Sequence, residues 1–159
     1  MIIAFAGPRP PKLGGYQLPN PTYNYVCQET EKLLLELKPD NCISGMCIGY
    51  DQWAANICIK LGIPFTAAVP FEGQESVWPE ASQKIFHILL KKAADKVVVS
   101  EGSYTAAKMQ VRNEYMCDHC DVLIAVYNGA TSGGTYNCIQ YAKSIGKKII
   151  FIDPALPQS

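Results

Sequence analysis

The sequence predicts an α/β fold, a three-layer sandwich in which a mostly parallel sheet of about six strands is covered by helices on both faces. Two observations lead to this prediction. Short, unbroken apolar runs, which are typical of strands buried on both faces, recur along the chain. Between them lie segments with the apolar spacing of amphipathic helices. Regular alternation of strand and helix indicates a parallel sheet with helical crossovers.

The N-terminal half contains strands that are each followed by a helix. We expect strands at 1–6, 42–44 and 64–69, and helices at 22–37, 51–61 and 80–94. Pro39 and Gly62 suit the ends of the first two helices, because proline cannot continue a helix and glycine favours the position after it. Two long loops, at 11–21 and 70–79, contain prolines and glycines without periodicity. Loops of this length are often functional.

The C-terminal half continues the alternation. We expect strands at 96–100, 122–127 and 147–152, and helices at 104–117 and from Tyr136 onward. Gly146 ends the last helix, and residues 154–159 are expected to form a loose tail. Residues 1–159 are expected to form a single domain, since a chain of this length suits one core and shows no internal repeat.

The composition narrows the class of protein. Fourteen basic residues balance fourteen acidic ones, so the broad positive field that drives nucleic-acid binding is missing. Seven cysteines cannot all pair within the chain, and several stand at apolar positions, which indicates a reduced protein. No apolar run approaches the length of a membrane span, and no secretory segment precedes the first strand. We expect a cytoplasmic protein without a membrane partner.

The stretch 121–137 gives the strongest indication of a ligand site. Its first half is the apolar run of a buried strand, and its second half is a turn of small residues leading into a helix. Gly133 and Gly134 would expose backbone N–H groups at the positive end of that helix, a frequent phosphate-binding arrangement. The same turn supplies the polar candidates Asn128, Ser132 and Thr135. A tight turn without a ligand is the alternative.

Two other turns follow strands at the same edge of the predicted sheet, where ligands of parallel sheets bind. In the first, Gly7 precedes Arg9, whose flanking prolines make a stiff turn suited to bidentate contact with phosphate or carboxylate. A surface arginine paired with a local acid is the alternative. The second turn contains Ser44, Gly45 and Asp51. Asp51 suits two roles, an acid in the first turn of a helix or an acceptor for ribose hydroxyl groups.

The predicted helix at 104–117 carries basic residues that could reach the same site. Lys108 and Arg112 lie one helical turn apart and could close over a phosphate held at the glycine turn. A solvated helix face, with Glu114 as the counter-charge, is the alternative.

The segment Cys117-Asp118-His119-Cys120 has the residue types of a metal clip. A zinc site needs four ligands, however, and usually takes a second pair from elsewhere in the chain. Cys47 and Cys138 have no paired spacing. We therefore expect structural thiols, no metal and no cofactor.

These segments together resemble the SLOG superfamily, which groups the YpsA-like proteins, the DNA-processing DprA fold and the LOG phosphoribohydrolases. The likeness is greatest to the YpsA-like branch. There the opening strand ends in a Thr-Gly-His-Arg-Pro type of motif, followed by Lys-Leu-Gly-Gly-Tyr. The corresponding segments here are 6–10 and 12–16. The other segments that match family motifs are 44–54, 70–79, 109–113 and Gly133-Gly134-Thr135.

The resemblance implies a Rossmann-like fold that binds a nucleotide or a nucleotide-derived ligand. LOG enzymes release a base from nucleoside 5′-monophosphates, using an Arg in a Met-x-x-Arg segment and a Glu in a glycine-rich motif. Arg112 matches that Arg, but the position of the Glu is Asn137 here, and Pro8 replaces a His of the YpsA-like branch. Because asparagine cannot act as an acid or a base at an oxocarbenium-like centre, standard LOG chemistry is not expected.

Three functions are consistent with these residues. The first is a binding protein that senses or sequesters a nucleotide-derived small molecule, such as a signalling nucleotide or an ADP-ribose derivative, in phage or bacterial defence conflict. The second is an N-glycosidase or phosphoribohydrolase of altered mechanism, in which Glu72, Glu75 or Glu114 would replace the missing glutamate beside Arg112. The third is DprA-like binding of single-stranded DNA, which the balanced charge disfavours. A homodimer or a higher homo-oligomer is the expected assembly.

Overall fold

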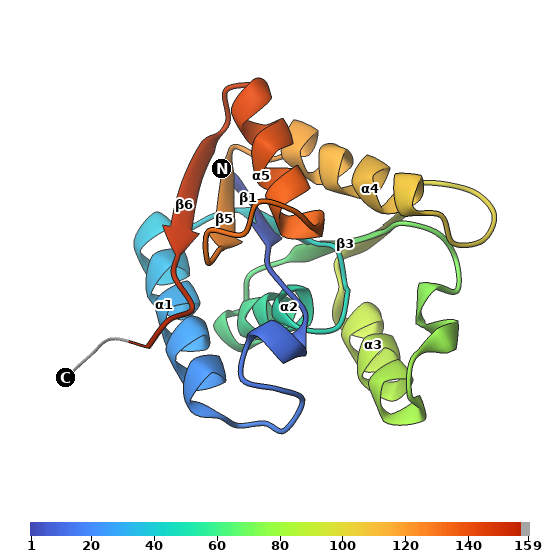
Figure 1. Ribbon diagram of the computed structural model, residues 1–159, viewed down its shortest axis with the longest axis horizontal. Coiled ribbons are helices and arrows are strands. Elements are labelled where there is room, and N and C mark those ends of the chain that lie inside the picture. The colour runs from blue at the N-terminus through green and yellow to red at the C-terminus, as the bar shows by residue number, and fades with distance from the viewer. Residues whose placement is uncertain (157–159) are drawn as a thin grey trace.

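The computed structural model describes residues 1–156 and contains one six-stranded sheet in the order β4-β3-β2-β1-β5-β6 (Figure 1). The strands are β1 (Ile2–Ala6), β2 (Asn41–Ser44), β3 (Phe65–Val69), β4 (Asp95–Val98), β5 (Val122–Val126) and β6 (Lys148–Ile152). The helices are α1 (Pro21–Leu37), α2 (Tyr50–Leu61), α3 (Glu80–Lys92), α4 (Ala106–His119) and α5 (Gly134–Ser144). All neighbouring strands run parallel. The predicted α/β class is confirmed.

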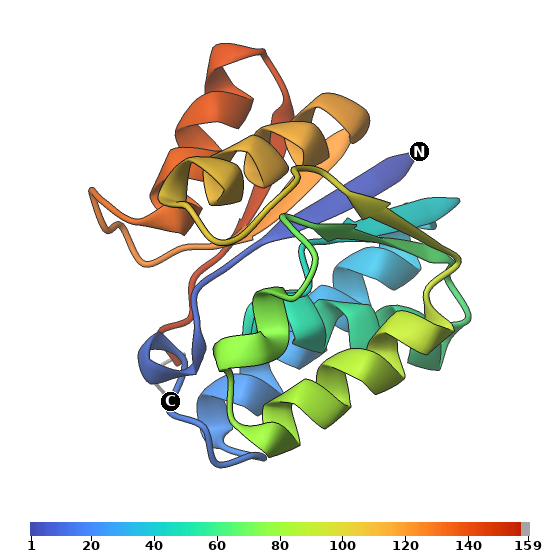
Figure 2. The same cartoon turned by 90° about the vertical axis from the view of Figure 1, so that its right-hand side faces the viewer.

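The direction in which the chain crosses the sheet reverses beside β1. From β1 the chain moves outward through β2 and β3 to β4, and then returns through α4 to β5 on the other side of β1. Helices α1, α2 and α3 therefore cover one face of the sheet, and α4 and α5 cover the other (Figure 2). Ligands of such sheets bind where the carboxyl ends of the two central strands diverge, which here is between β1 and β5.

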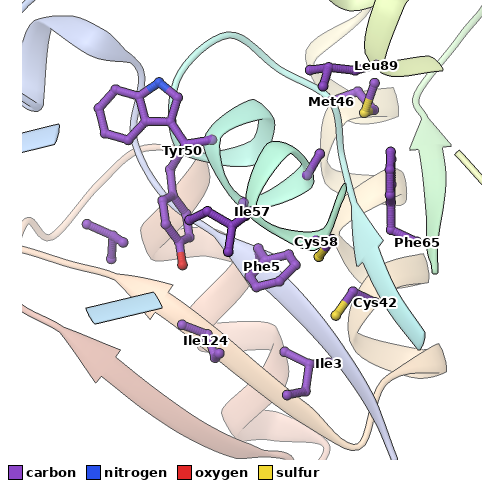
Figure 3. Packing of buried hydrophobic residues seen from close by; sticks show 14 of the residues in the cluster. Ile3, Phe5, Cys42, Met46, Tyr50, Ile57, Cys58, Phe65, Leu89 and Ile124 are labelled. Carbon is purple, nitrogen blue, oxygen red and sulfur yellow. The ribbon is translucent and has the colours of Figure 1, made fainter. Parts of the chain in front are cut away.

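Tight packing of β1 on α2 fixes the turn that follows β1. Phe5 and Tyr50 pack edge to face with ring centroids 6.1 Å apart (Figure 3). The hydroxyl oxygens of Tyr50 and Thr30 lie 2.8 Å apart, so the polar atoms of this buried contact are satisfied. Gly7 belongs to the same contact, because a Cβ there would lie 2.5 Å from Cδ2 of Tyr50. The packing of Tyr50 against β1 therefore requires glycine at this position.

Strand β5 is buried at every position, as its unbroken apolar run predicts. One of its faces packs against α1 and α2, through the cluster that contains Ile124. The other packs against α4 and α5, where Leu123 meets Met116 and Ile139. The strand that leads into the glycine turn is therefore held rigidly from both sides.

The predicted order of elements is confirmed, and the differences lie at their ends. Helix α5 begins at Gly134 and not at Tyr136, so the glycine turn forms the first turn of the helix itself. Each long loop contains a short 3-10 helix, Pro10–Lys12 in the first and Gln74–Val77 in the second. Such single turns have no periodicity long enough to detect in a sequence. Part of the predicted tail, after residue 156, lies outside the described residues.

Candidate functional site

A cavity of about 450 Å³ opens where the crossing direction reverses. Its walls come from the turn after β1, the start of α2, the middle of α4 and the turn between β5 and α5. These segments are distant in sequence and meet because parallel strands end at a common edge of the sheet. We call this space the switch-point cavity.

The turn between β5 and α5 forms an unfilled cradle in the wall of the switch-point cavity. Gly133 is the N-cap of α5 with a φ of 102°, a backbone conformation that favours glycine. Neither Gly133 nor Gly134 has any atom within 4 Å of the point where a Cβ would stand, and both line the cavity. The first N–H groups of a helix have no partner within the helix, so α5 offers free donors at this wall.

Arg112 lies buried in the middle of α4 and supports another wall. Its Nη1 donates to the carbonyl oxygen of Gly45 at 2.6 Å, and its Nε donates to Oδ1 of Asn113 at 3.1 Å. Nη1 and Nη2 also contact Sγ of Cys47 at 3.8 and 3.6 Å. Asn113 in turn donates from Nδ2 to the carbonyl oxygen of Gly134 at 3.4 Å. The guanidinium is thus held in one orientation and tied to the glycine cradle.

The residues that line the switch-point cavity carry more positive than negative charge. Arg9, Lys12 and Arg112 are the basic lining residues, and Asp51 is the acidic one. Within residues 1–156, no carboxylate lies within 4.0 Å of the guanidinium of Arg9 or Arg112. A guanidinium without a close counter-ion favours the binding of an anion.

Asp51 stands buried in the first turn of α2 near Arg112. Burial raises the pKa of the Asp51 carboxyl above its ordinary value, while the charge of Arg112 and a hydrogen bond from the backbone N–H of Cys47 act in the opposite direction. That N–H lies 3.4 Å from Oδ2 of Asp51. Because desolvation outweighs the arginine, Asp51 holds its proton more firmly than an exposed carboxyl would.

The structure brings a majority of the candidate ligand-binding residues to the switch-point cavity. Those that line it are Gly7, Arg9, Asp51, Arg112, Ser132, Gly133, Gly134 and Thr135. Those that do not line it are Ser44, Gly45, Lys108 and Asn128. The cavity therefore unites the turn after β1 with the glycine cradle and the arginine of α4.

The candidates outside the cavity bond to the protein itself. The hydroxyl of Ser44 donates to the carbonyl oxygen of Asp51 at 2.7 Å. Nζ of Lys108 donates to the carbonyl oxygen of Ser103 at 2.6 Å. The side chain of Asn128 accepts, at 3.0 Å, from the backbone N–H two residues further on and closes its own turn. These contacts give each residue a structural role.

The candidate catalytic glutamates also lie away from the switch-point cavity. Neither Glu75 nor Glu114 lines it, and Glu72 pairs with Nζ of Lys96 at 2.6 Å. Asn137 is absent from the lining as well. Asp51 is therefore the carboxylate that lines this cavity.

A second cavity, of about 680 Å³, adjoins the first. Arg9, Ile48, Tyr104 and Met109 line both spaces. The second cavity is formed mainly by the loop at 70–79, so we call it the loop cavity. The sequence predicted a functional loop here and offered Glu72 and Glu75 within it as catalytic candidates, but it gave no role to Gln74. Cys47, Asn113 and Tyr104 were also missed as lining residues, because their positions depend on how distant segments meet.

The described residues offer no arrangement suited to a metal ion. Within residues 1–156, no group of three or more His, Cys, Asp and Glu side chains is placed to hold one. All seven cysteines are free thiols, and Sγ of Cys117 lies 3.6 Å from Sγ of Cys138. In this part of the chain, no helix combines the length and the apolar character that crossing a membrane requires.

Comparison with known proteins identifies the family. The sequence model of the YspA SLOG family matches residues 3–154. The chain belongs to this family. The uncharacterized SPbeta prophage-derived protein YoqJ of Bacillus subtilis is 36% identical over 130 residues, covering 71% of this chain and 75% of the relative. A UPF0398 protein of Halalkalibacterium halodurans is 28% identical over 152 residues, covering 89% of this chain and 80% of the relative.

Solved structures share the fold of this SLOG protein at lower sequence identity. DNA processing protein A from Helicobacter pylori, studied for its single-stranded DNA binding mode, gives a TM-score of 0.68 at 18% identity and covers 100% of this chain and 66% of its own. DNA processing protein A from Streptococcus pneumoniae gives a TM-score of 0.67 at 18% identity. The match covers 99% of this chain and 50% of that chain. The molybdenum cofactor binding protein from Rippkaea orientalis gives 0.59 at 18% identity, covering 94% of this chain and 74% of its own.

Proposed function

We propose that this SLOG protein binds a phosphate-bearing, nucleotide-derived small molecule in the switch-point cavity and senses or sequesters it without consuming it. The observation that carries the proposal is the unfilled cradle of Gly133 and Gly134, which shares one cavity with Arg9 and Arg112. Backbone donors at a helix N-terminus and arginines without a close counter-ion are complementary to a phosphate group.

The remaining features of the cavity agree with a nucleotide as the source of that phosphate. A volume of about 450 Å³ is within the range of small-molecule sites. Asp51 lines the same space and can accept hydrogen bonds from ribose hydroxyl groups. An ADP-ribose derivative or a signalling nucleotide has both groups. The prophage origin of the relative YoqJ supports a role in conflict between phage and bacterium.

A second candidate function, an N-glycosidase or phosphoribohydrolase of altered mechanism, is favoured by one observation. Asp51 lines the cavity, and its burial raises the pKa of its carboxyl, which suits proton transfer to a leaving base. Arg112 would then stabilise the charge of the phosphate. Binding without turnover remains the better supported function, because Glu75 and Glu114 lie outside the cavity.

The decisive experiment is mass spectrometry of small molecules released by heat from the purified protein, followed by incubation with a panel of nucleotides. A retained and chemically unchanged nucleotide supports capture, whereas free base and ribose phosphate accumulating with time support the enzyme. Gly134→Val should reduce nucleotide affinity at least tenfold, because its side chain would fill the open cradle. If this variant binds nucleotides with normal affinity, the anion site does not lie at Gly134.

Binding of single-stranded DNA and self-association are tested separately. The balanced charge of the chain favours a small molecule over DNA, so affinity for a single-stranded oligonucleotide should be weak at physiological salt. Tight binding that falls steeply with salt would instead support a DprA-like role. A homodimer is part of the proposal, and sedimentation equilibrium over a range of concentrations tests it.

A further inference from the structure

The loop cavity differs in chemistry from the switch-point cavity. Phe71, Trp78 and Tyr104 line it, together with Tyr16. Tyr16 and Tyr104 are 63% and 64% exposed, so their rings are accessible to a ligand that enters this cavity. Aromatic walls of this kind bind planar rings by stacking.

One residue that lines this cavity has a buried polar atom without a partner. Gln74 is 5% exposed and lines the loop cavity. Its Oε1 accepts from Sγ of Cys47 at 3.7 Å. Its Nε2 is the one buried side-chain nitrogen or oxygen in residues 1–156 that lacks a hydrogen-bond partner. Because an unpaired buried donor destabilises a fold, this amide is suited to a partner that a bound ligand supplies.

The two cavities are joined by a chain of contacts. Arg112 lines the switch-point cavity and donates to Sγ of Cys47 at 3.6 Å, and Cys47 reaches Oε1 of Gln74 at 3.7 Å. Arg9 and Tyr104 line both spaces. A ligand whose phosphate lies in the first cavity could therefore extend into the second without leaving the protein surface.

We propose that the loop cavity is a nucleobase subsite of the same ligand. The base stacks on Tyr104 and presents a carbonyl oxygen or a ring nitrogen, as acceptor, to Nε2 of Gln74. The inference rests on the proposed function, since the phosphate is the part that the switch-point cavity holds. Gln74 then selects among rings, because a buried donor rejects an analogue that lacks the matching acceptor.

The test is isothermal titration of the full chain with AMP, GMP, ADP-ribose and ribose 5-phosphate, of which the last has no base. At least one of the three nucleotides should bind tenfold or more tightly than ribose 5-phosphate. Gln74→Leu should remove about tenfold of that nucleotide affinity and leave ribose 5-phosphate unchanged, because it deletes one donor to the base. Gln28→Leu, at an exposed position of α1, is the matched control.

A second pair of variants tests stacking. Tyr104→Ser should weaken the same nucleotide about tenfold, whereas Tyr104→Phe, which keeps the ring, should bind normally. The urea midpoint of Gln74→Leu should equal or exceed that of the wild type, since the variant removes an unpaired buried donor.

The outcomes separate this inference from the function on which it rests. If ribose 5-phosphate binds as tightly as every nucleotide, the base subsite is wrong and the phosphate site stands. If Gln74→Leu weakens ribose 5-phosphate as strongly as the nucleotides, Gln74 acts on the first cavity through Cys47 and the subsite is again wrong. If none of the four compounds binds, the proposed function fails together with the subsite.

Discussion

Two glycine turns join a strand to a helix at the edge of this sheet, and they are built in opposite ways. In the turn after β2, a Cβ on Gly45 would lie 2.8 Å from Cζ of Arg112 and 2.9 Å from Oδ2 of Asp51. In the turn before α5, a Cβ on Gly134 would meet nothing within 4 Å. The first turn is filled by charged groups of the protein itself, and the second leaves its space open to a ligand.

The filled turn also contains local strain that the open one lacks. Met46 is buried in the left-handed region at a φ of 65°, which costs about 1 kcal/mol for a residue other than glycine. The backbone N–H of Met46 donates to Oγ of Ser44 at 3.2 Å, and that hydroxyl donates to the carbonyl oxygen of Asp51 at 2.7 Å. Glycine in a strand-to-helix turn therefore does not by itself indicate a phosphate site.

The sharpest way to test this contrast is to remove Arg112, the arginine that fills the first turn. Arg112→Ala should lower the free energy of unfolding by about 3 kcal/mol, since the carbonyl of Gly45 loses a charged donor and buried Asp51 loses its nearest positive charge. The melting temperature should fall by about 10 °C, measured by circular dichroism.

Arg9→Ala is the matched control for the arginine comparison. Arg9 is exposed and lines both cavities, so its removal should leave stability within about 0.5 kcal/mol of the wild type while weakening nucleotide binding. Equal loss of stability in the two variants would contradict the idea that the filled turn alone depends on its arginine.

The second test makes the same substitution in both turns. Gly45→Ala should destabilise the protein by about 2 kcal/mol, because the new methyl group forces the guanidinium of Arg112 out of place. Gly134→Ala should instead raise stability by about 0.5 kcal/mol, as alanine is a better helix former and meets no neighbour there. Urea unfolding measures both changes. A loss of stability in Gly134→Ala would show that the cradle is tightly packed, against the open geometry described above.

The sequence could predict the fold because its signals are local and repeated. The apolar run of β5, the helix stop at Pro39 and the alternation of elements each act within a few residues. The glycine cradle was also predictable, since a buried strand, two glycines and a helix are adjacent in the chain. The position of these elements in one sheet then follows from general rules of topology.

The contents of the site could not be predicted in the same way, because they depend on contacts between distant residues. Ser44 and Gly45 share a turn with Asp51, yet only Asp51 of these lines the cavity. The burial of Arg112 follows from its bond to Gly45, 67 residues away. The unpaired amide of Gln74 results from how a loop closes on Cys47. Contacts of this kind leave no periodic pattern in the sequence from which they could be predicted.

The smallest effect concerns the proton on Asp51 in the filled turn. Because its pKa is raised in the folded protein, its contribution to stability is complete below the unfolded value of 3.8 and is lost as the pH rises through the folded value. Asp51→Asn cannot ionise at this position. The stability of the wild type relative to this variant should therefore decrease as the pH rises above the unfolded pKa of 3.8, as measured by urea unfolding at each pH.

The sign of that pH dependence also bears on ligand binding. If the stability of the wild type relative to Asp51→Asn rises with pH, Arg112 neutralises the Asp51 carboxylate, and less positive charge remains for a phosphate. If it falls, Asp51 gives up its proton reluctantly, and the guanidinium stays available to an anion held at Gly134. The two turns then contribute to one anion site. The turn after β2 positions the guanidinium of Arg112, and the turn before α5 supplies backbone N–H donors, which carry no full charge.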